Sequence, residues 1–235
     1  MNLGQVLIVM PAMNEAEVIP ATIAEVQRVI PGANILVIDD GSDDETSALA
    51  RDAGVEVLRL PFNLGVGAAM RLGFQYAANH GYPVMVQLDS DGQHDPADVP
   101  RLVEGLGEAD VVIGARFAGV GEYRARGPRM WAMRVLSQLL SRVVRTKLTD
   151  TTSGFKAHGP RAIDVFKVDF PAEYLGDTVE ALVIGHRAGL TFAQCPVAMR
   201  ERAGGTPSQN GLRSAVYLVR AMLAMLLALL RVRVK

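Results

Sequence analysis

The sequence is poor in several features that define common classes of protein. Cys195 is the only cysteine, which excludes a disulfide framework and a cysteine-based metal site and is typical of a reducing compartment. Lys and Arg number 24 against 25 Asp and Glu, and without a basic excess nucleic acid is not the expected main partner. The N-terminus has no basic start, and its apolar run is too short for a signal peptide. What remains is a chain of 235 residues, a length that favours one domain with an appendage.

The sequence is rich in short apolar runs that alternate with helical patterns. Hydrophobic residues make up 49 % of the chain, enough for a sizeable core. Strands are predicted at 5–10, 34–39, 55–60, 83–88 and 110–114. Helices are predicted between them, near 15–30, 43–53, 65–79 and 97–107. Nearly continuous apolar strands separated by helices indicate an α/β fold with a mostly parallel sheet covered on both faces.

The second half of the chain has a more helical pattern. Helices are predicted near 128–146, 160–167 and 174–188, followed by a strand near 191–199 and a helix from about 212 to 230. The stretch "LTDTTSGFKAHGP", 148–160, is polar and contains glycine, so its composition predicts a loop between helices.

Two acidic side chains follow the predicted strand 83–88. Asp89 and Asp91 lie one residue apart, with Gln93 shortly after. Ligands of open α/β sheets bind beyond the carboxyl ends of the strands, and Mg²⁺ takes one or two carboxylates there together with substrate phosphates. The alternative is a polar turn. His94 is expected to be a solvated loop residue rather than a ligand, and Asp95 is expected to cap a helix.

A second acidic pair ends the strand 34–39, in "VIDDGSDDET". Asp39 and Asp40 face the same edge, where a carboxylate can accept hydrogen bonds from a nucleobase or a ribose. The alternative is turn chemistry, because Ser42 and Glu45 have the spacing of a capping box that opens a helix. Further along, "NLGVGAAM" lacks the third glycine of a dinucleotide fingerprint and predicts a tight entry into a helix.

Taken together, these stretches resemble the family 2 glycosyltransferases, in particular the branch of dolichol-phosphate mannosyltransferases and polyprenyl-phosphate glycosyltransferases. The resemblance covers about residues 5 to 206. The motifs that carry it occur in the family's order: "MPAMNEAEVI", "VIDDGSDDET", "NLGVGAAMRLGF", "QLDSDGQHDP", "VIGARF", "DTTSGFK" and "RERAGG". The resemblance implies a GT-A fold, a nucleotide-diphosphate sugar donor such as a UDP- or GDP-sugar, and Mg²⁺ or Mn²⁺ as cofactor.

The resemblance also implies roles on the donor side of the site. The residues expected to line the nucleoside pocket are Pro11, Ala12, Asn14 and Glu15, with Asp39 on the base or ribose. Those expected to coordinate the metal are Asp89, Asp91 and Gln93. Arg202, in the glycine-rich loop 199–211, is expected to hold the donor pyrophosphate.

On the acceptor side, the resemblance places four residues near an acceptor phosphate: Arg116, Arg134, Ser137 and Ser153. The implied reaction is transfer of a sugar to a polyprenyl phosphate with inversion, in which Asp91 and Arg116 take part in catalysis. An anionic lipid phosphate needs no general base, whereas a saccharide or small hydroxy-acid acceptor does. Asp177 and Glu180 are the candidates for such a base.

Three features depart from the family's pattern. Val66 replaces a lysine that many relatives carry, and the glycine-rich loop continues "GGTPSQ" rather than with the Ser-Lys ending of many mannosyltransferases, which argues less for GDP-mannose. Many longer relatives also carry a multi-span membrane domain after the catalytic part, which is not expected here. A catalytic domain is therefore expected over 1–206, with a donor half (about 1–115) and an acceptor half (about 116–206).

The C-terminal segment 207–235 is predicted to hold an amphipathic helix. Its unbroken apolar run, 221–230, is half of the roughly 20 residues that a membrane-spanning helix needs. Arg213 and Arg220 fall on the face opposite Leu223 and Leu226. Such a helix suits an anionic bilayer surface, a small membrane protein or a second subunit, with packing on the core as the alternative. We therefore expect a cytoplasmic protein that lies peripherally on the inner face of the cell membrane.

Overall fold

The apolar runs predicted as strands assemble into one sheet. The structure, a computed structural model, describes residues 3–116, 128–171 and 177–200, and within the helices it leaves the side chains of 128–134 and 177 undescribed. The strands of this part are β1 (Val6–Ala12), β2 (Asn34–Asp39), β3 (Glu56–Arg59), β4 (Val84–Gln87), β5 (Val111–Ala115), β6 (Lys156–His158) and β7 (Phe192–Pro196). Their order in the sheet is β3-β2-β1-β4-β6-β5-β7, and only β6 among them runs antiparallel to its neighbours.

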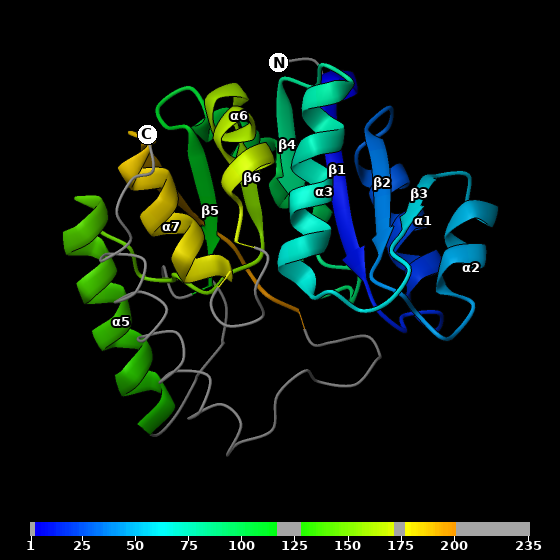
Figure 1. Ribbon diagram of the computed structural model, residues 1–235, viewed down its shortest axis with the longest axis horizontal. Helices are drawn as coiled ribbons and strands as arrows, with labels where there is room; N and C mark the ends of the chain where they lie inside the picture. The colour runs from blue at the N-terminus through cyan, green and yellow to red at the C-terminus, as the bar shows by residue number, and fades with distance from the viewer. Residues whose placement is uncertain (1–2, 117–127, 172–176, 201–235) are drawn as a thin grey trace.

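Helices cover both faces of the sheet, as Figure 1 shows. The α-helices are α1 (Ile19–Val29), α2 (Thr46–Asp52), α3 (Val66–Asn79), α4 (Val99–Gly105), α5 (Pro128–Val144), α6 (Pro160–Asp169) and α7 (Asp177–Arg187), with short 3₁₀ turns at Leu3–Gln5 and Pro96–Asp98. One core cluster joins the sheet to α3, α5, α6 and α7, and the other joins it to α1, α2 and α4. Successive residues of β1 alternate between these clusters, because strand side chains point to opposite faces. Two-sided burial explains why β1, β2, β4 and β5 are nearly continuous apolar runs.

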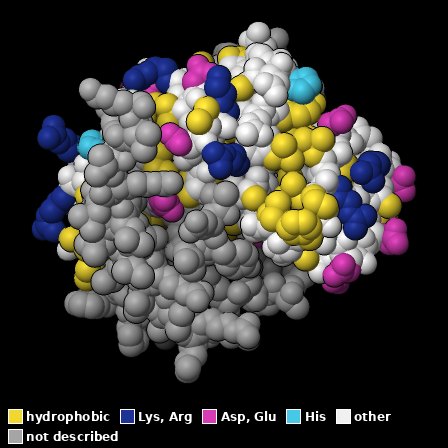
Figure 2. Space-filling model, viewed as in Figure 1, with side chains coloured by type: hydrophobic (Ala, Val, Ile, Leu, Met, Phe, Trp, Pro, Cys, Tyr) yellow, Lys and Arg dark blue, Asp and Glu magenta, His cyan; other side chains and the backbone are white. Residues whose placement is uncertain are grey.

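The structure confirms the α/β class and the predicted strands and helices to within a few residues at their ends. Strand β2 has the predicted bounds, and α3 begins at Val66, directly after Gly65 with its positive φ of 90°. The described surface facing the viewer in Figure 2 mixes basic and acidic side chains, in keeping with the net charge of −1. None of the described helices is long and apolar enough to cross a membrane. The predicted helix 212–230 and the boundary at 206 lie outside the described residues.

The loop prediction for 148–160 is wrong at one point. Lys156–His158 forms β6, which lies between β4 and β5 and pairs with both. Lys156 is opposite Gln87 on one side and Ile113 on the other. Three residues are too few to show a strand period, and the segment becomes a strand only because two neighbouring strands supply its hydrogen bonds.

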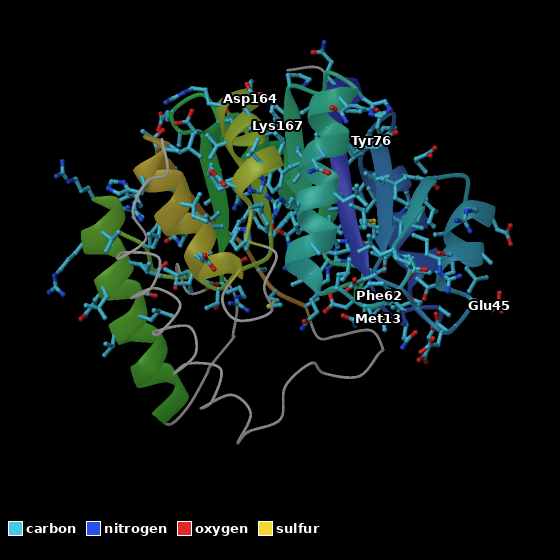
Figure 3. All side chains as sticks on the ribbon, in the orientation of Figure 1. Met13, Glu45, Phe62, Tyr76, Asp164 and Lys167 are labelled. Atoms are coloured by element: carbon cyan, nitrogen blue, oxygen red, sulfur yellow. The ribbon has the colours of Figure 1, made fainter. Side chains whose placement is uncertain are left out.

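The carboxyl ends of β1, β2, β4 and β5 lie at one edge of the sheet, the lower edge in Figure 1. At this edge Gly41 follows β2 with φ 77°. A Cβ on Gly41 would lie 2.6 Å from the backbone carbonyl carbon of Phe62 and 2.8 Å from the backbone nitrogen of Asn63. The turn after β2 therefore packs directly on the backbone of the loop before α3. Figure 3 labels Phe62 and Met13, which follows β1, at this lower edge.

We predict that Gly41→Ala destabilises the protein through this backbone contact. Gly54 has the same φ of 77° but open space around a Cβ, so Gly54→Ala is the matched control that incurs only the left-handed strain, about 1–2 kcal/mol. Gly41→Ala should cost about 1–3 kcal/mol more than the control because of overpacking. Urea unfolding of both variants measures the difference, and equal midpoints would contradict the close approach.

Candidate active site

The segment after β4 carries the first acidic pair. The side chain of Asp89 is 36 % exposed, whereas Asp91 is 5 % exposed and accepts a hydrogen bond from the backbone N–H of Gln93 at 3.0 Å. Between them, the Ser90 hydroxyl donates to the carbonyl of Pro11 at 3.0 Å. The Thr22 hydroxyl of α1 donates to the carbonyl of Ser90, also at 3.0 Å. The segment is thus fixed to the end of β1 and to α1, with Asp89 as the carboxylate that reaches solvent.

The predicted metal ligand Gln93 contacts the segment that follows β7. The backbone N–H of Arg200 donates to the carbonyl of Gln93 at 3.0 Å, and Gln93 Nε2 lies 3.4 Å from the carbonyl oxygen of Arg200. The guanidinium of Arg200 binds both carboxylate oxygens of Glu25 at 2.9 Å and Asp95 Oδ2 at 2.7 Å. Since Nε2 faces Arg200, the amide oxygen of Gln93 is the atom left to act as an oxygen ligand.

The prediction that His94 is a solvated loop residue is wrong. It is 4 % exposed and stacks on Phe155, with ring centroids 4.8 Å apart and an interplanar angle of 13°. The backbone N–H of Asp89 donates to His94 Nδ1 at 3.2 Å. Asp95, by contrast, caps the next helical turn as predicted, since it accepts from the N–H of Ala97 at 2.9 Å.

The segment before β6 closes the other side of the edge. Arg116 forms a bidentate ion pair with Asp150: Nε donates to Oδ2 at 2.6 Å and Nη2 to Oδ1 at 2.9 Å. Nη2 also donates to the Thr152 hydroxyl at 2.8 Å. Burial alone raises the pKa of Asp150, but the hydrogen bonds and charge of Arg116 outweigh it, so the pKa lies below its usual value. The pair fixes the direction of Arg116 at the end of β5.

Gly154 packs directly against the exposed carboxylate. A Cβ at this position would lie 3.0 Å from both Asp89 oxygens and 3.1 Å from Gln87 Nε2. The absence of a side chain leaves room for Asp89. Among the described residues, no three His, Cys, Asp or Glu side chains come together around one point. A pair of carboxylates with an amide oxygen nevertheless fits Mg²⁺ or Mn²⁺, which complete their shell with water and substrate phosphates.

The second acidic pair holds the neighbouring turns. Asp39 is fully buried; its Oδ1 accepts from the N–H of Ser42 at 2.8 Å and its Oδ2 from the Ser47 hydroxyl. Asp40 accepts from the N–H groups of Leu64 and Gly65 at 2.7 and 2.8 Å. Burial, with the charge of Asp39, raises the pKa of Asp40, and these two backbone donors counter the rise. Both aspartates therefore fix loops at the edge.

The capping box predicted for Ser42 and Glu45 is wrong. The Ser42 hydroxyl accepts from the N–H of Asn14 at 2.9 Å, and Asp44 rather than Ser42 accepts from the first turn of α2, at the N–H of Thr46. The Asn14 side chain in turn accepts from the N–H of Asp43 at 2.8 Å. A contact between two loops has thus replaced a local cap.

The predicted nucleoside residues lie on this pair of joined loops. Pro11 and Ala12 end β1, and Asn14, exposed and with φ 54°, begins the turn that follows. The N–H of Glu15 donates to the Thr46 hydroxyl at 2.8 Å. The turns after β1 and β2 therefore form one unit beside the segment that carries Asp89 and Asp91.

Comparison with known proteins assigns this arrangement to a family. The sequence pattern of "Glycosyl transferase family 2" matches residues 7–164. The chain belongs to this family.

Two relatives within the family are similar to this glycosyltransferase over most of its length. An undecaprenyl-phosphate mannosyltransferase of Micrococcus luteus is 31% identical over 219 residues, 88% of each chain. A polyprenol monophosphomannose synthase of Mycolicibacterium smegmatis is 31% identical over 229 residues, 91% of this chain and 84% of the relative.

A solved structure shares the fold. Glucosyl-3-phosphoglycerate synthase from Mycobacterium tuberculosis, in complex with Mn²⁺, uridine diphosphate and glucosyl-3-phosphoglycerate, superposes with a TM-score of 0.70 at 20% identity. The superposition covers 97% of this chain and 81% of that one. The predicted GT-A fold is confirmed by this match and by the sheet order.

The structure brings together the residues predicted for the donor side more clearly than those predicted for the acceptor side. Ser137 and Ser153 are buried; their hydroxyls contact the carbonyl of Thr149 at 3.4 Å and the N–H of Phe155 at 3.3 Å. The side chains of Arg134 and Asp177 and the whole of Arg202 lie outside the described part of the chain. Their roles, and those of the other site residues, stay predictions.

Sequence reasoning missed Asp150 and Gly154 as individual residues of the site. Both lie in "TDTTSGFK", which composition alone describes as a polar loop. Asp150 contacts Arg116, and Gly154 packs on Asp89. Both contacts join positions more than 30 residues apart. The segment 155–158 that follows them, FKAH, is not an apolar run, so the sequence carried no local signal that could have found them.

We predict that Asp150→Asn destabilises the glycosyltransferase by about 3–5 kcal/mol at pH 7, because it leaves the Arg116 guanidinium buried without its counter-charge. Asp164, which pairs with Lys167 at 2.7 Å on the exposed surface of α6 (Figure 3), is the control, and Asp164→Asn should cost less than about 1 kcal/mol.

The cost of Asp150→Asn should also depend on pH. A carboxyl with a lowered pKa stabilises the fold at every pH above its unfolded value of 3.8 and loses that stabilisation as pH falls further. Urea unfolding should therefore show a constant gap between the wild type and Asp150→Asn from pH 7 to about 5 that narrows below about 4. A difference in stability between the two proteins that grows in acid would contradict the lowered pKa of Asp150.

Proposed function

We propose that this glycosyltransferase moves a sugar from a nucleotide-diphosphate sugar to a polyprenyl phosphate, with Mg²⁺ or Mn²⁺ held by Asp89, Asp91 and Gln93. The observation that supports it best is the strand-end pair: Asp89 reaches solvent at the carboxyl edge, directly beside the joined loops after β1 and β2. The names of the two relatives support the lipid-phosphate acceptor. The complex of the solved structure supports a divalent metal and a nucleotide donor.

On the donor side, the proposed nucleoside pocket is made of the loops after β1 and β2 rather than of one helix. We assign Pro11, Ala12, Asn14 and Glu15 to the nucleoside, with Asp39 behind them. Because Asp39 exposes no surface, its role here is to hold the turn that shapes the pocket, and direct contact with a base or ribose would need that turn to move. UDP and GDP both remain candidates.

The donor bond breaks with negative charge left on the nucleotide diphosphate. A divalent cation, when bound, neutralises that charge. The carboxylates of Asp89 and Asp91 would hold that cation, and we assign Arg202 to the pyrophosphate. Since the carboxylates follow a strand buried on both faces, their positions are set before the donor binds.

On the acceptor side, the phosphate oxygen of the lipid attacks the anomeric carbon from the face opposite the leaving group, so the configuration inverts. A phosphate monoester is anionic near pH 7 and needs no general base. We assign Arg116, Arg134, Ser137 and Ser153 to the acceptor region. Arg116 reaches it already aligned by its bidentate pair with Asp150. Asp177 would become a base only for a hydroxyl acceptor.

The proposed acceptor also indicates the cellular location of the protein. A polyprenyl phosphate lies in a membrane, while nucleotide sugars are in the cytoplasm. We therefore propose a peripheral position on the inner face of the cell membrane, with the segment 207–235 as the contact to the bilayer, a small membrane protein or a second subunit.

We predict that Asp89→Asn and Asp91→Asn each lower sugar transfer by about 100-fold or more, because each removes a charge that holds the cation against the diphosphate. Asp43→Asn is the matched control, since Asp43 is an exposed carboxylate at the same edge whose contact to Asn14 is made by its backbone. Transfer is measured from UDP- and GDP-sugars to a polyprenyl phosphate, with Mn²⁺ and with chelator.

Several outcomes of this assay contradict the proposal. Transfer that survives in both variants or in chelator would exclude the metal role of the pair. Transfer to free saccharides or hydroxy acids, but not to the lipid phosphate, would keep the donor side and replace the acceptor.

A further inference from the structure

Asp89 is confined on two sides by residues to which no role has been given. We propose that His94 and Gly154 are positioning residues that hold the Asp89 carboxylate in one orientation for the divalent cation. His94 acts from the same loop, and Gly154 acts from the segment that enters β6. The inference rests on the proposed function and adds to it the parts of the chain that align the metal ligand.

His94 fixes the backbone of Asp89. Since a backbone N–H can only donate, His94 Nδ1 must be the acceptor of the 3.2 Å hydrogen bond, and the ring proton is therefore on Nε2. Nε2 lies 3.8 Å from Asp89 Oδ2. That distance is too long for a hydrogen bond, but it leaves the edge of the imidazole that carries the proton near the carboxylate. One ring thus faces both the backbone and the side chain of Asp89.

The imidazole itself is held rigidly. It is 4 % exposed and lies nearly parallel to the ring of Phe155, which is completely buried. The backbone of His94 forms an antiparallel bridge with Met199, directly before Arg200. Because Phe155 follows Gly154 in the chain, the stacking connects the loop of Asp89 to the segment that packs on it from the other side.

Gly154 limits the carboxylate from that side. A Cβ here would lie 3.0 Å from both Asp89 oxygens, a contact in which one partner must shift. The φ of Gly154 lies outside the left-handed region, so an alanine could adopt this backbone. A Cβ at this position would therefore displace the Asp89 carboxylate by a few tenths of an ångström, whereas the turn itself would accept an alanine.

Confinement from both sides has a defined consequence for binding. A carboxylate with few accessible rotamers loses little conformational freedom when it takes up an ion, so its affinity for the ion is higher. Changes to groups that orient metal ligands typically lower metal affinity or activity by about 10- to 100-fold. An effect of this kind appears in the metal dependence of the reaction rather than in its rate at saturating metal.

The test measures Mn²⁺ binding to the wild type and three variants by electron paramagnetic resonance, in the presence of UDP or GDP. His94→Phe keeps the stacking on Phe155 but removes both nitrogens, and Gly154→Ala inserts the missing Cβ. Both should weaken Mn²⁺ binding by about 10- to 100-fold. His94→Asn returns an acceptor for the Asp89 N–H and should recover part of the loss. In transfer assays the apparent KM for Mn²⁺ should rise more than kcat falls.

Gly105→Ala is the control for a tight glycine away from the site. Its Cβ would meet the Val112 side chain at 3.1 Å, and Gly105 also lies outside the left-handed region. This variant should bind Mn²⁺ as the wild type does, even if its thermal midpoint falls. Equal losses of Mn²⁺ affinity in Gly105→Ala and Gly154→Ala would show a general loss of structure and overturn the positioning role.

Failure of the positioning role and failure of the proposed function give different experimental results. A wild type that binds Mn²⁺ with a nucleotide, together with His94→Phe and Gly154→Ala variants of unchanged affinity, would overturn the positioning role alone. A wild type that binds no Mn²⁺ with either nucleotide and transfers no sugar would overturn the proposed function and this inference with it.

Discussion

Carboxylates that accept backbone N–H groups at the ends of buried strands are the interaction on which the rest of this structure depends. Asp39 closes the turn after β2, Asp40 holds the loop before α3, and Asp91 holds the turn after β4. A buried carboxylate without such donors would be strongly destabilising, so each loop is confined to the conformation that satisfies its aspartate. The edge of the sheet is therefore a preformed site, and Asp89 is the member of its two acidic pairs that is partly exposed.

The same constraint explains how distant segments meet. The turns after β1 and β2 exchange hydrogen bonds through Asn14 and Ser42, and Arg116 is aligned by Asp150 across 34 positions. The sheet order β4-β6-β5 brings the segment before β6 next to Asp89. The proposed transfer needs a donor and an acceptor side by side, and the position of β6 between β4 and β5 fits that need.

The sequence was sufficient to predict the elements whose signal is local and repeated. Strands such as β1 and β4 are buried on both faces, so their apolar runs identify them, and the polar residues that follow mark the carboxyl edge. The features it could not predict depend on long-range contacts. Lys156–His158 is a strand only between β4 and β5, His94 is buried only because Phe155 stacks on it, and Ser42 caps no helix because Asn14 takes its hydroxyl.

The central claim is that Asp89 and Asp91 hold a divalent cation against the donor diphosphate. The most direct measurement is a crystal structure of the chain with Mn²⁺ and UDP or GDP, with data collected at the manganese absorption edge. The account predicts one anomalous peak within about 2.0–2.6 Å of carboxylate oxygens of this pair and of a diphosphate oxygen. A nucleotide bound at this edge without a peak there, or with manganese bound elsewhere, would contradict it.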